Sequence, residues 1–99
     1  MPHSPALSAT SVITRNGAVI ETEIDGEIVA LNIDSGNCYG LNPVGSRVWN
    51  LIAAPIRISD ICAQLIVEYQ VQADTCEQQV MDLLEELRAE GLITTLPDS

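Results

Sequence analysis

The chain has 99 residues and a formal net charge of −10, from fourteen acidic residues against four arginines and no lysine. A nucleic-acid-binding protein needs positive charge to displace counterions from phosphate, so this balance disfavours binding to DNA or RNA. The apolar content of 46% indicates a folded chain, and the length suffices for one domain with a single modest core.

The sequence contains no signal for membrane insertion or secretion. No apolar run approaches the roughly 18 residues of a membrane-spanning helix, and the first residues lack the basic and apolar regions of a signal peptide. We therefore expect a cytoplasmic protein without a membrane partner. Residues 1–10 are expected to form a flexible tail, residues 11–96 the folded domain, and residues 97–99 a frayed end.

Alternating apolar and polar residues predict an antiparallel sheet in the first part of the domain. Residues 18–24 and 27–33 form two strands, joined by Asp25-Gly26, a dipeptide that tolerates the positive φ angles of a tight hairpin turn. A second turn leads to a third, short strand at residues 38–41. Residues 11–15 also favour extended structure.

Apolar residues at helical spacing predict three helices in the second part of the chain. The first begins at Pro43, with Asn42 as its N-cap and Trp49 beside its apolar stripe. The second has Ser59 as its N-cap and an apolar stripe that ends at Tyr69.

The third predicted helix begins near Asp74, which forms a capping box with Glu77, and ends before Gly91, which suits a left-handed C-terminal position. The fold class is therefore α+β, a winged helix-turn-helix-like arrangement in which a three-stranded antiparallel sheet is followed by three helices. This order raises the hypothesis of a winged-helix DNA-binding regulator. Against it, residues 74–90 carry six acidic residues and one cation, Arg88, which phosphate would repel.

The residue types also argue against catalysis and metal binding. The only histidine, His3, lies in the predicted tail, and the cysteines Cys38, Cys62 and Cys76 form no closely spaced pair. A zinc site needs about four converging ligands, and a cysteine nucleophile needs a base beside it. We expect a non-enzymatic protein without a metal or cofactor; the competing hypothesis is a small enzyme or thiol carrier that uses Cys38 or Cys76.

The remaining possibility is a binding protein. The last strand of the predicted meander leaves an edge of unpaired N–H and C=O groups, which is either protected or used as a template for an added strand. The amphipathic third helix provides the opposite wall of a groove, or it covers the sheet and its side chains fill the space. The residues alone leave both arrangements open.

A sequence resemblance favours the first arrangement. The stretch from Tyr39 to Trp49, with its Tyr-Gly-Leu-Asn-Pro-Val-Gly form, resembles the tyrosine-x-leucine-asparagine, glycine and tryptophan signature of PqqD-like proteins. The resemblance covers residues 11–96. The matching residues of the closing helix are Leu83, Leu84, Leu87, Gly91 and Leu92.

The resemblance implies a peptide recognition element that binds the leader of a ribosomally synthesised precursor and presents it to a modifying enzyme. The chain is most similar to the stand-alone leader-binding proteins of lasso-peptide biosynthesis, whose partner is a separate leader protease. The alternative is a PqqD-type peptide chaperone for a radical-SAM enzyme in the synthesis of pyrroloquinoline quinone or another peptide product.

The same resemblance implies where the leader binds. The leader adds as a strand beside the third strand and lies in a groove against the third helix. The strand side of the expected site consists of Cys38, Tyr39, Gly40 and Leu41, with Leu31 and Ile33 behind them. The helical wall consists of Val80, Met81, Leu84 and Leu87, with Arg88 at the rim.

Overall fold

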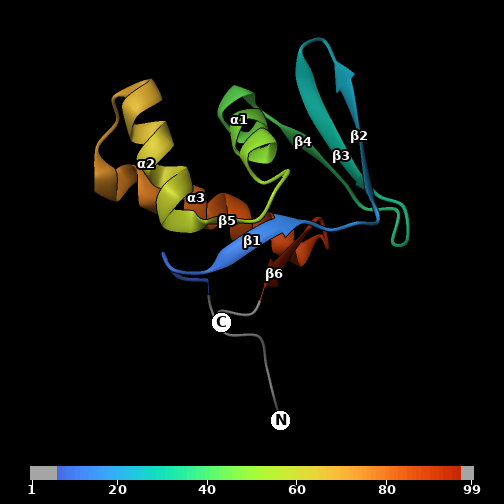
Figure 1. Cartoon of the computed structure of the whole chain (residues 1–99). Helices are drawn as coiled ribbons and strands as arrows, with labels where there is room; N and C mark the ends of the chain where they lie inside the picture. Colours follow the sequence, from blue (N-terminus) through green and yellow to red (C-terminus); the bar gives the residue numbers. More distant parts are fainter. Residues whose placement is uncertain (1–6, 97–99) are drawn as a thin grey trace.

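The computed structural model describes residues 7–96, which form two small antiparallel sheets and three helices (Figure 1). The elements in chain order are β1 (Val12–Arg15), β2 (Val19–Ile24), β3 (Glu27–Asn32), β4 (Cys38–Leu41), α1 (Pro43–Leu51), β5 (Ile56–Arg57), α2 (Ile58–Tyr69), α3 (Ala73–Ala89) and β6 (Ile93–Leu96). The predicted α+β class and the three helices are confirmed.

The predicted meander is the sheet with strand order β2-β3-β4. Asp25 and Gly26 have φ angles of 53° and 83°, as the tight β2–β3 turn requires. The face toward the helices is buried at Ile28, Ala30 and Leu41. The sheet therefore has one face against the core and its edge strand, β4, directly before α1.

A second sheet, with strand order β5-β1-β6, was not predicted as a sheet. Strand β1 pairs with β6 from Val12 opposite Leu96 to Arg15 opposite Ile93, and with the two-residue strand β5 on its other side. This sheet joins the two ends of the domain, which lie side by side in Figure 1. Two residues are too few to show a strand periodicity, and the partner of β1 lies about eighty positions away.

The helix ends agree with the predictions at two positions and differ at two. The Asn42 Oδ1 accepts a hydrogen bond from the Gly45 N–H at 2.7 Å, and Gly91 has a φ of 72°. The predicted caps Ser59 and Asp74 are wrong, because each lies inside its helix. In α2, the N–H groups of Ile58 and Ser59 instead donate to backbone carbonyls of residues 11 and 9, so a side-chain cap is not needed.

The N-terminal residues differ from the predicted tail. Leu7 is 6% exposed and belongs to the core, and residues 8–11 form a turn whose backbone holds the start of α2. Residues 7–10 are therefore part of the domain. Residues 1–6 and 97–99, also predicted as tails, lie outside the described residues.

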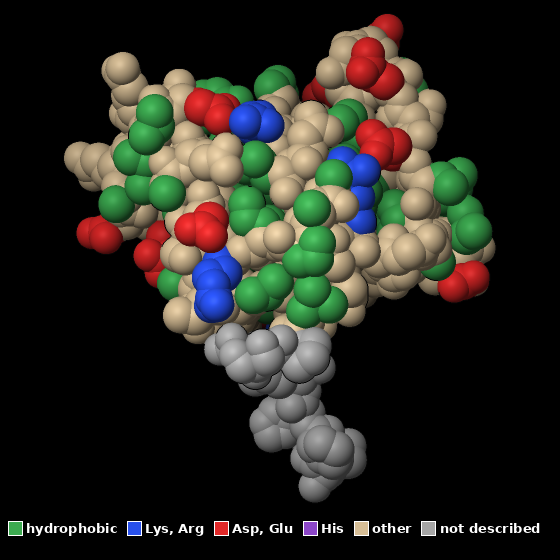
Figure 2. Space-filling view, viewed as in Figure 1, with side chains coloured by type: hydrophobic (Ala, Val, Ile, Leu, Met, Phe, Trp, Pro, Cys, Tyr) green, Lys and Arg blue, Asp and Glu red, His purple; other side chains and the backbone are tan. Residues whose placement is uncertain are grey.

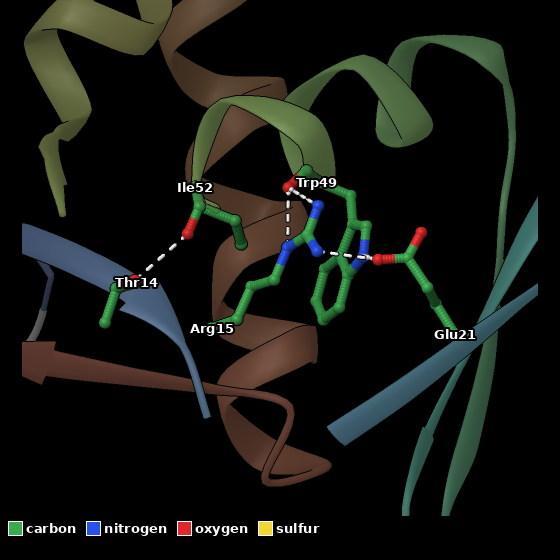
Figure 3. A network of polar contacts seen from close by, with 5 residues as sticks. All are labelled: Thr14, Arg15, Glu21, Trp49 and Ile52. Atoms are coloured by element: carbon green, nitrogen blue, oxygen red, sulfur yellow. Dashed lines mark hydrogen bonds and ion pairs between the residues drawn. The ribbon is translucent and has the colours of Figure 1, made fainter. Parts of the chain in front are cut away.

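One polar network connects β1, β2 and α1 (Figure 3). The Arg15 Nε and Nη2 donate to the Trp49 carbonyl oxygen at 3.0 and 2.8 Å, and its Nη1 donates to Glu21 at 2.6 Å. The Arg15 guanidinium also lies 4.6 Å from the centre of the Trp49 ring, whose Nε1 donates to the same Glu21 oxygen at 3.2 Å. The network fixes the β2–β3 hairpin relative to the helices.

Candidate functional site

Strand β4 is the edge of its sheet: among the described strands, only β3 pairs with it. The Asn32 N–H donates to the Asn37 carbonyl at 2.8 Å, and hydrogen-bonded pairs alternate with non-hydrogen-bonded pairs along an antiparallel ladder. In the register that pairs Ala30 with Tyr39, the backbone groups of Tyr39 therefore point toward β3. Those of Cys38 and Gly40 point toward the free edge.

A groove of about 390 Å³ lies between the end of β4, the start of α1 and one face of α3. Its β4 and α1 side consists of Tyr39, Asn42, Val44 and Gly45, and its α3 side consists of Gln79, Asp82, Leu83 and Glu86. The Tyr39 hydroxyl donates a hydrogen bond to the Glu86 carboxylate and so links β4 to α3 directly. The predicted groove between the edge strand and the third helix is thus present.

The groove continues into an apolar pocket of about 270 Å³ between the three helices, because Val44, Gln79 and Leu83 line both. The other lining residues are Val48, Leu65, Tyr69, Val71, Cys76 and Val80. Val44, Tyr69 and Val71 are 42%, 43% and 39% exposed, which is high for large apolar side chains. An apolar side chain that enters this pocket would remove their surfaces from water.

The α3 side of the groove is negatively charged. Asp82 and Glu86 are exposed there, and the described part of the groove lining contains no cation. The hydrogen bond to Glu86 raises the pKa of Tyr39, with smaller contributions from its burial and from the charges of Glu86 and Glu90. The hydroxyl therefore stays protonated at neutral pH, and the groove combines a negative wall with an apolar end.

The five residues predicted for the helical wall do not lie in the groove beside β4. Leu84 and Leu87 are fully buried in the core, and Val80, which is 3% exposed, contributes only to the apolar pocket. Met81 and Arg88 are about 200° around the helix from Leu83 and Glu86, respectively, because each helical residue turns the chain by about 100°. Val80, Leu84 and Leu87 belong to the buried stripe of α3, and the groove lies along the flank of that stripe.

The strand residues divide between three environments. Tyr39 is in the groove, and Leu41 is 1% exposed and part of the core. The backbone N–H and C=O groups of Cys38 and Gly40 point toward the free edge. The Cys38 side chain is exposed on the sheet face opposite the helices. Leu31 pairs with Cys38, so its side chain lies on the same side of the sheet, away from the helices. Ile33 follows on that side at 59% exposure, and neither side chain lies behind the groove.

Sequence reasoning missed Gln79, Leu83 and Glu86, together with Val44. The first three recur at spacings of four and three, so they form one continuous line along the helix. Such a line beside an apolar stripe, with a leucine among polar residues, indicates a partly exposed flank of the helix, but it does not show that β4 lies against that flank. Val44 lies in the first turn of α1 and is 42% exposed.

Within residues 7–96, no group of three or more histidine, cysteine, aspartate or glutamate side chains is placed to hold a metal ion. Cys62 and Cys76 are buried, and burial raises the pKa of Cys62 to about 11, with Cys76 contributing less. In the same part of the chain, no helix has the length and apolarity needed to cross a bilayer.

Comparisons with known proteins show which family and which solved structures the chain resembles. The family model described as Coenzyme PQQ synthesis protein D (PqqD) matches residues 27–93. The structure described as "TbiB1 in Complex with the TbiA(beta) Leader Peptide" is 33% identical, with a TM-score of 0.76 over 86% of this chain and 99% of that one.

A second structure, "Lasso peptide synthetase B1 complexed with the leader peptide", has the same fold at 21% identity, with a TM-score of 0.72 over 86% of this chain and 98% of that one. No match was found among the curated proteins. The family match spans β3 to the start of β6 and so includes both sides of the groove. The chain belongs to the PqqD family.

Proposed function

We propose that this protein binds the leader segment of a ribosomally synthesised precursor peptide as an added strand on β4, in the groove against α3. The observation that carries the proposal is the unpaired edge of β4 beside that groove. Both structures reported above are described as complexes with a leader peptide, and one of them shares 33% of its residues with this chain.

The role is presentation rather than catalysis. The bound precursor is held in extended form for a separate processing enzyme, which in the lasso-peptide pathway is a leader protease. A peptide held along an edge strand has its backbone register fixed and its unbound end free, so an enzyme acting on that end meets a defined geometry.

The groove also specifies the chemistry of the peptide. An apolar side chain of the leader fills the pocket lined by Val44, Leu83 and Tyr69, and a lysine or arginine near it lies against Asp82 and Glu86. Each backbone hydrogen bond contributes about 0.5–1.5 kcal/mol. Ordering a flexible leader costs about 2–5 kcal/mol, so the apolar side chain is needed for measurable affinity.

A single substitution tests strand addition. Gly40→Pro removes an N–H that points to the free edge, while the ladder to β3 keeps its hydrogen bonds at Tyr39 and Leu41. We expect a loss of affinity for a synthetic leader of its proposed precursor, measured by titration calorimetry, of about tenfold or more.

Gly40→Ala is the matched control. A Cβ at this position meets nothing within 4 Å, and alanine keeps the N–H, so affinity should remain at the native value. Equal affinity of the proline and alanine variants, both folded by circular dichroism, would show that the peptide does not add to β4. Absence of binding by the folded native protein at high micromolar leader would refute leader binding itself.

A further inference from the structure

The face of the β2-β3-β4 sheet that points away from the helices is apolar and uncovered among the described residues. Ile20, Ile24 and Ile33 are 55%, 56% and 59% exposed there. Val29 and Leu31 lie between them, because Ile20 pairs with Leu31 and Thr22 pairs with Val29. We call these five residues, Ile20, Ile24, Val29, Leu31 and Ile33, the outer face.

The outer face is a continuous patch rather than scattered apolar residues. Residues opposite each other on paired strands have neighbouring side chains, so the two strands place aliphatic groups in adjacent rows. All three helices lie on the other side of the sheet (Figure 1). A contiguous exposed apolar patch on a folded protein marks an interaction surface, whereas single exposed leucines or isoleucines do not.

The charges around the outer face indicate what binds there. Asp25, Glu27 and Asp34 are exposed at its margins, and residues 18–41 contain no lysine or arginine. Figure 2 shows acidic side chains gathered at the tip of the hairpin. A second copy of this chain would place the same acidic residues against each other, whereas a partner with lysines or arginines around an apolar centre would be attracted.

We propose that the outer face is the docking surface for the processing enzyme, and that this enzyme presents an apolar patch rimmed by lysine or arginine. The inference rests on the proposed leader-binding function. A peptide added to β4 extends the same sheet, and every second side chain of a strand points to the same face. Alternate leader side chains therefore lie beside Cys38 and Gly40 and continue the outer face.

This arrangement predicts that the enzyme recognises one continuous surface, formed by the outer face and the bound leader together. An enzyme docked on the outer face contacts the alternate side chains of the leader about 4.8 Å beyond β4, the usual distance between paired strands. Leader binding therefore enlarges the surface that the enzyme meets. The native protein should bind the enzyme more tightly when the leader is present, and by linkage the enzyme should tighten leader binding equally.

The test uses the full chain and the purified leader protease of its proposed pathway. In the double variant Ile20→Ser with Ile24→Ser, both replaced side chains are more than half exposed, so the core is unchanged. We expect affinity for the enzyme to fall by about tenfold or more, as for loss of central apolar contacts. Leader affinity, measured without the enzyme, should stay within about twofold of the native value.

Val67→Ser is the control, because this valine is 77% exposed but lies on α2. It should change neither affinity. Glu27→Lys should weaken enzyme binding and reduce its dependence on salt, since it reverses one charge at the margin.

Unchanged enzyme affinity in the double variant would overturn the proposal, and so would a native dimer that the double variant abolishes. Because leader affinity is measured separately, these outcomes are distinct from a failure of leader binding. If leader binding itself fails, the native protein will bind no leader when the enzyme is absent.

Discussion

The three cysteines show how position in the fold controls chemistry at a single residue. Cys62 is 8% exposed and Cys76 is 4% exposed, and the Cys76 Sγ lies 3.9 Å from the Cys62 carbonyl oxygen, within reach of a weak hydrogen bond. Cys38, by contrast, is exposed on the side of β4 that points away from the helices. The two buried thiols act as small apolar side chains between α2 and α3.

The buried thiol predicts a loss of stability at alkaline pH. Burial raises the pKa of Cys62 from 9.0 to about 11. Below pH 9 the thiol is protonated in both the folded and the unfolded chain. As the pH rises from 9 toward 11, the unfolded chain releases the proton while the folded chain retains it, so the free energy of unfolding decreases.

Urea unfolding at several pH values between 8 and 10.5 measures this decrease. Cys62→Ala should be less stable than the native protein at pH 8, but its stability should fall less steeply with pH. Tyr39, whose pKa is also raised, is present in both proteins and contributes equally. Parallel pH profiles would contradict the assignment to Cys62.

Individual residues could be predicted where local chemistry decides their role. Asn42 as a cap and Gly91 in the left-handed region follow from side-chain reach and the absence of a Cβ. The choice between Leu83 and Leu84 does not, because both lie on the apolar side of α3 and only the position of β4 places one in the groove. Because Leu84 is fully buried, Leu84→Asp would unfold the protein and could not report on leader binding.

At the scale of elements, the Arg15 network determines how the hairpin is attached. The Arg15 side chain is 24% exposed and donates twice to the carbonyl of Trp49, near the end of α1 where helix carbonyls lack partners within the helix. We expect Arg15→Met to lower the free energy of unfolding by about 1–3 kcal/mol in urea titrations at pH 7, because hydrogen bonds from a partly buried charge are lost.

Arg47→Met is the comparison variant. Arg47 pairs with Glu68 at 2.8 Å, but the two side chains are 36% and 34% exposed, so water screens their interaction. Its loss should lower the free energy of unfolding less than the loss of Arg15 does. Equal losses in the two variants would mean that the network in Figure 3 does not contribute more than an ordinary surface pair.

The elements themselves were predicted to different extents for a physical reason. The β2-β3-β4 meander was found because its turns are local and its strands alternate. The β5-β1-β6 sheet depends on pairing between residues 12–15 and 93–96, which leaves no trace in either segment alone. This second sheet places β6 beside β1, at the start of the domain.

At the scale of the whole molecule, fourteen acidic residues outnumber four arginines and leave a net charge of −10. Arg15, Arg47 and Arg88 each form an ion pair with a glutamate of the same chain, and Arg57 donates to the carbonyl of Thr10. The surface therefore carries a negative field that attracts basic peptides over about 10 Å at 0.1 M salt.

This field predicts that leader affinity decreases with added salt, and the groove determines how steeply. Glu86→Gln combined with Asp82→Asn removes two charges beside the bound peptide, while the glutamine can still accept the hydrogen bond from Tyr39. We expect calorimetric titrations between 0.05 and about 1 M sodium chloride to show a shallower salt dependence for this variant than for the native protein. At high salt the two affinities should converge, because the apolar pocket is unchanged.

Asp60→Asn is the control variant. It removes one exposed charge in the first turn of α2, at the end of that helix away from the pocket, and should keep nearly the native salt dependence. If leader affinity depends equally on salt in the Glu86→Gln, Asp82→Asn variant and the native protein, the leader does not place its basic residues against α3.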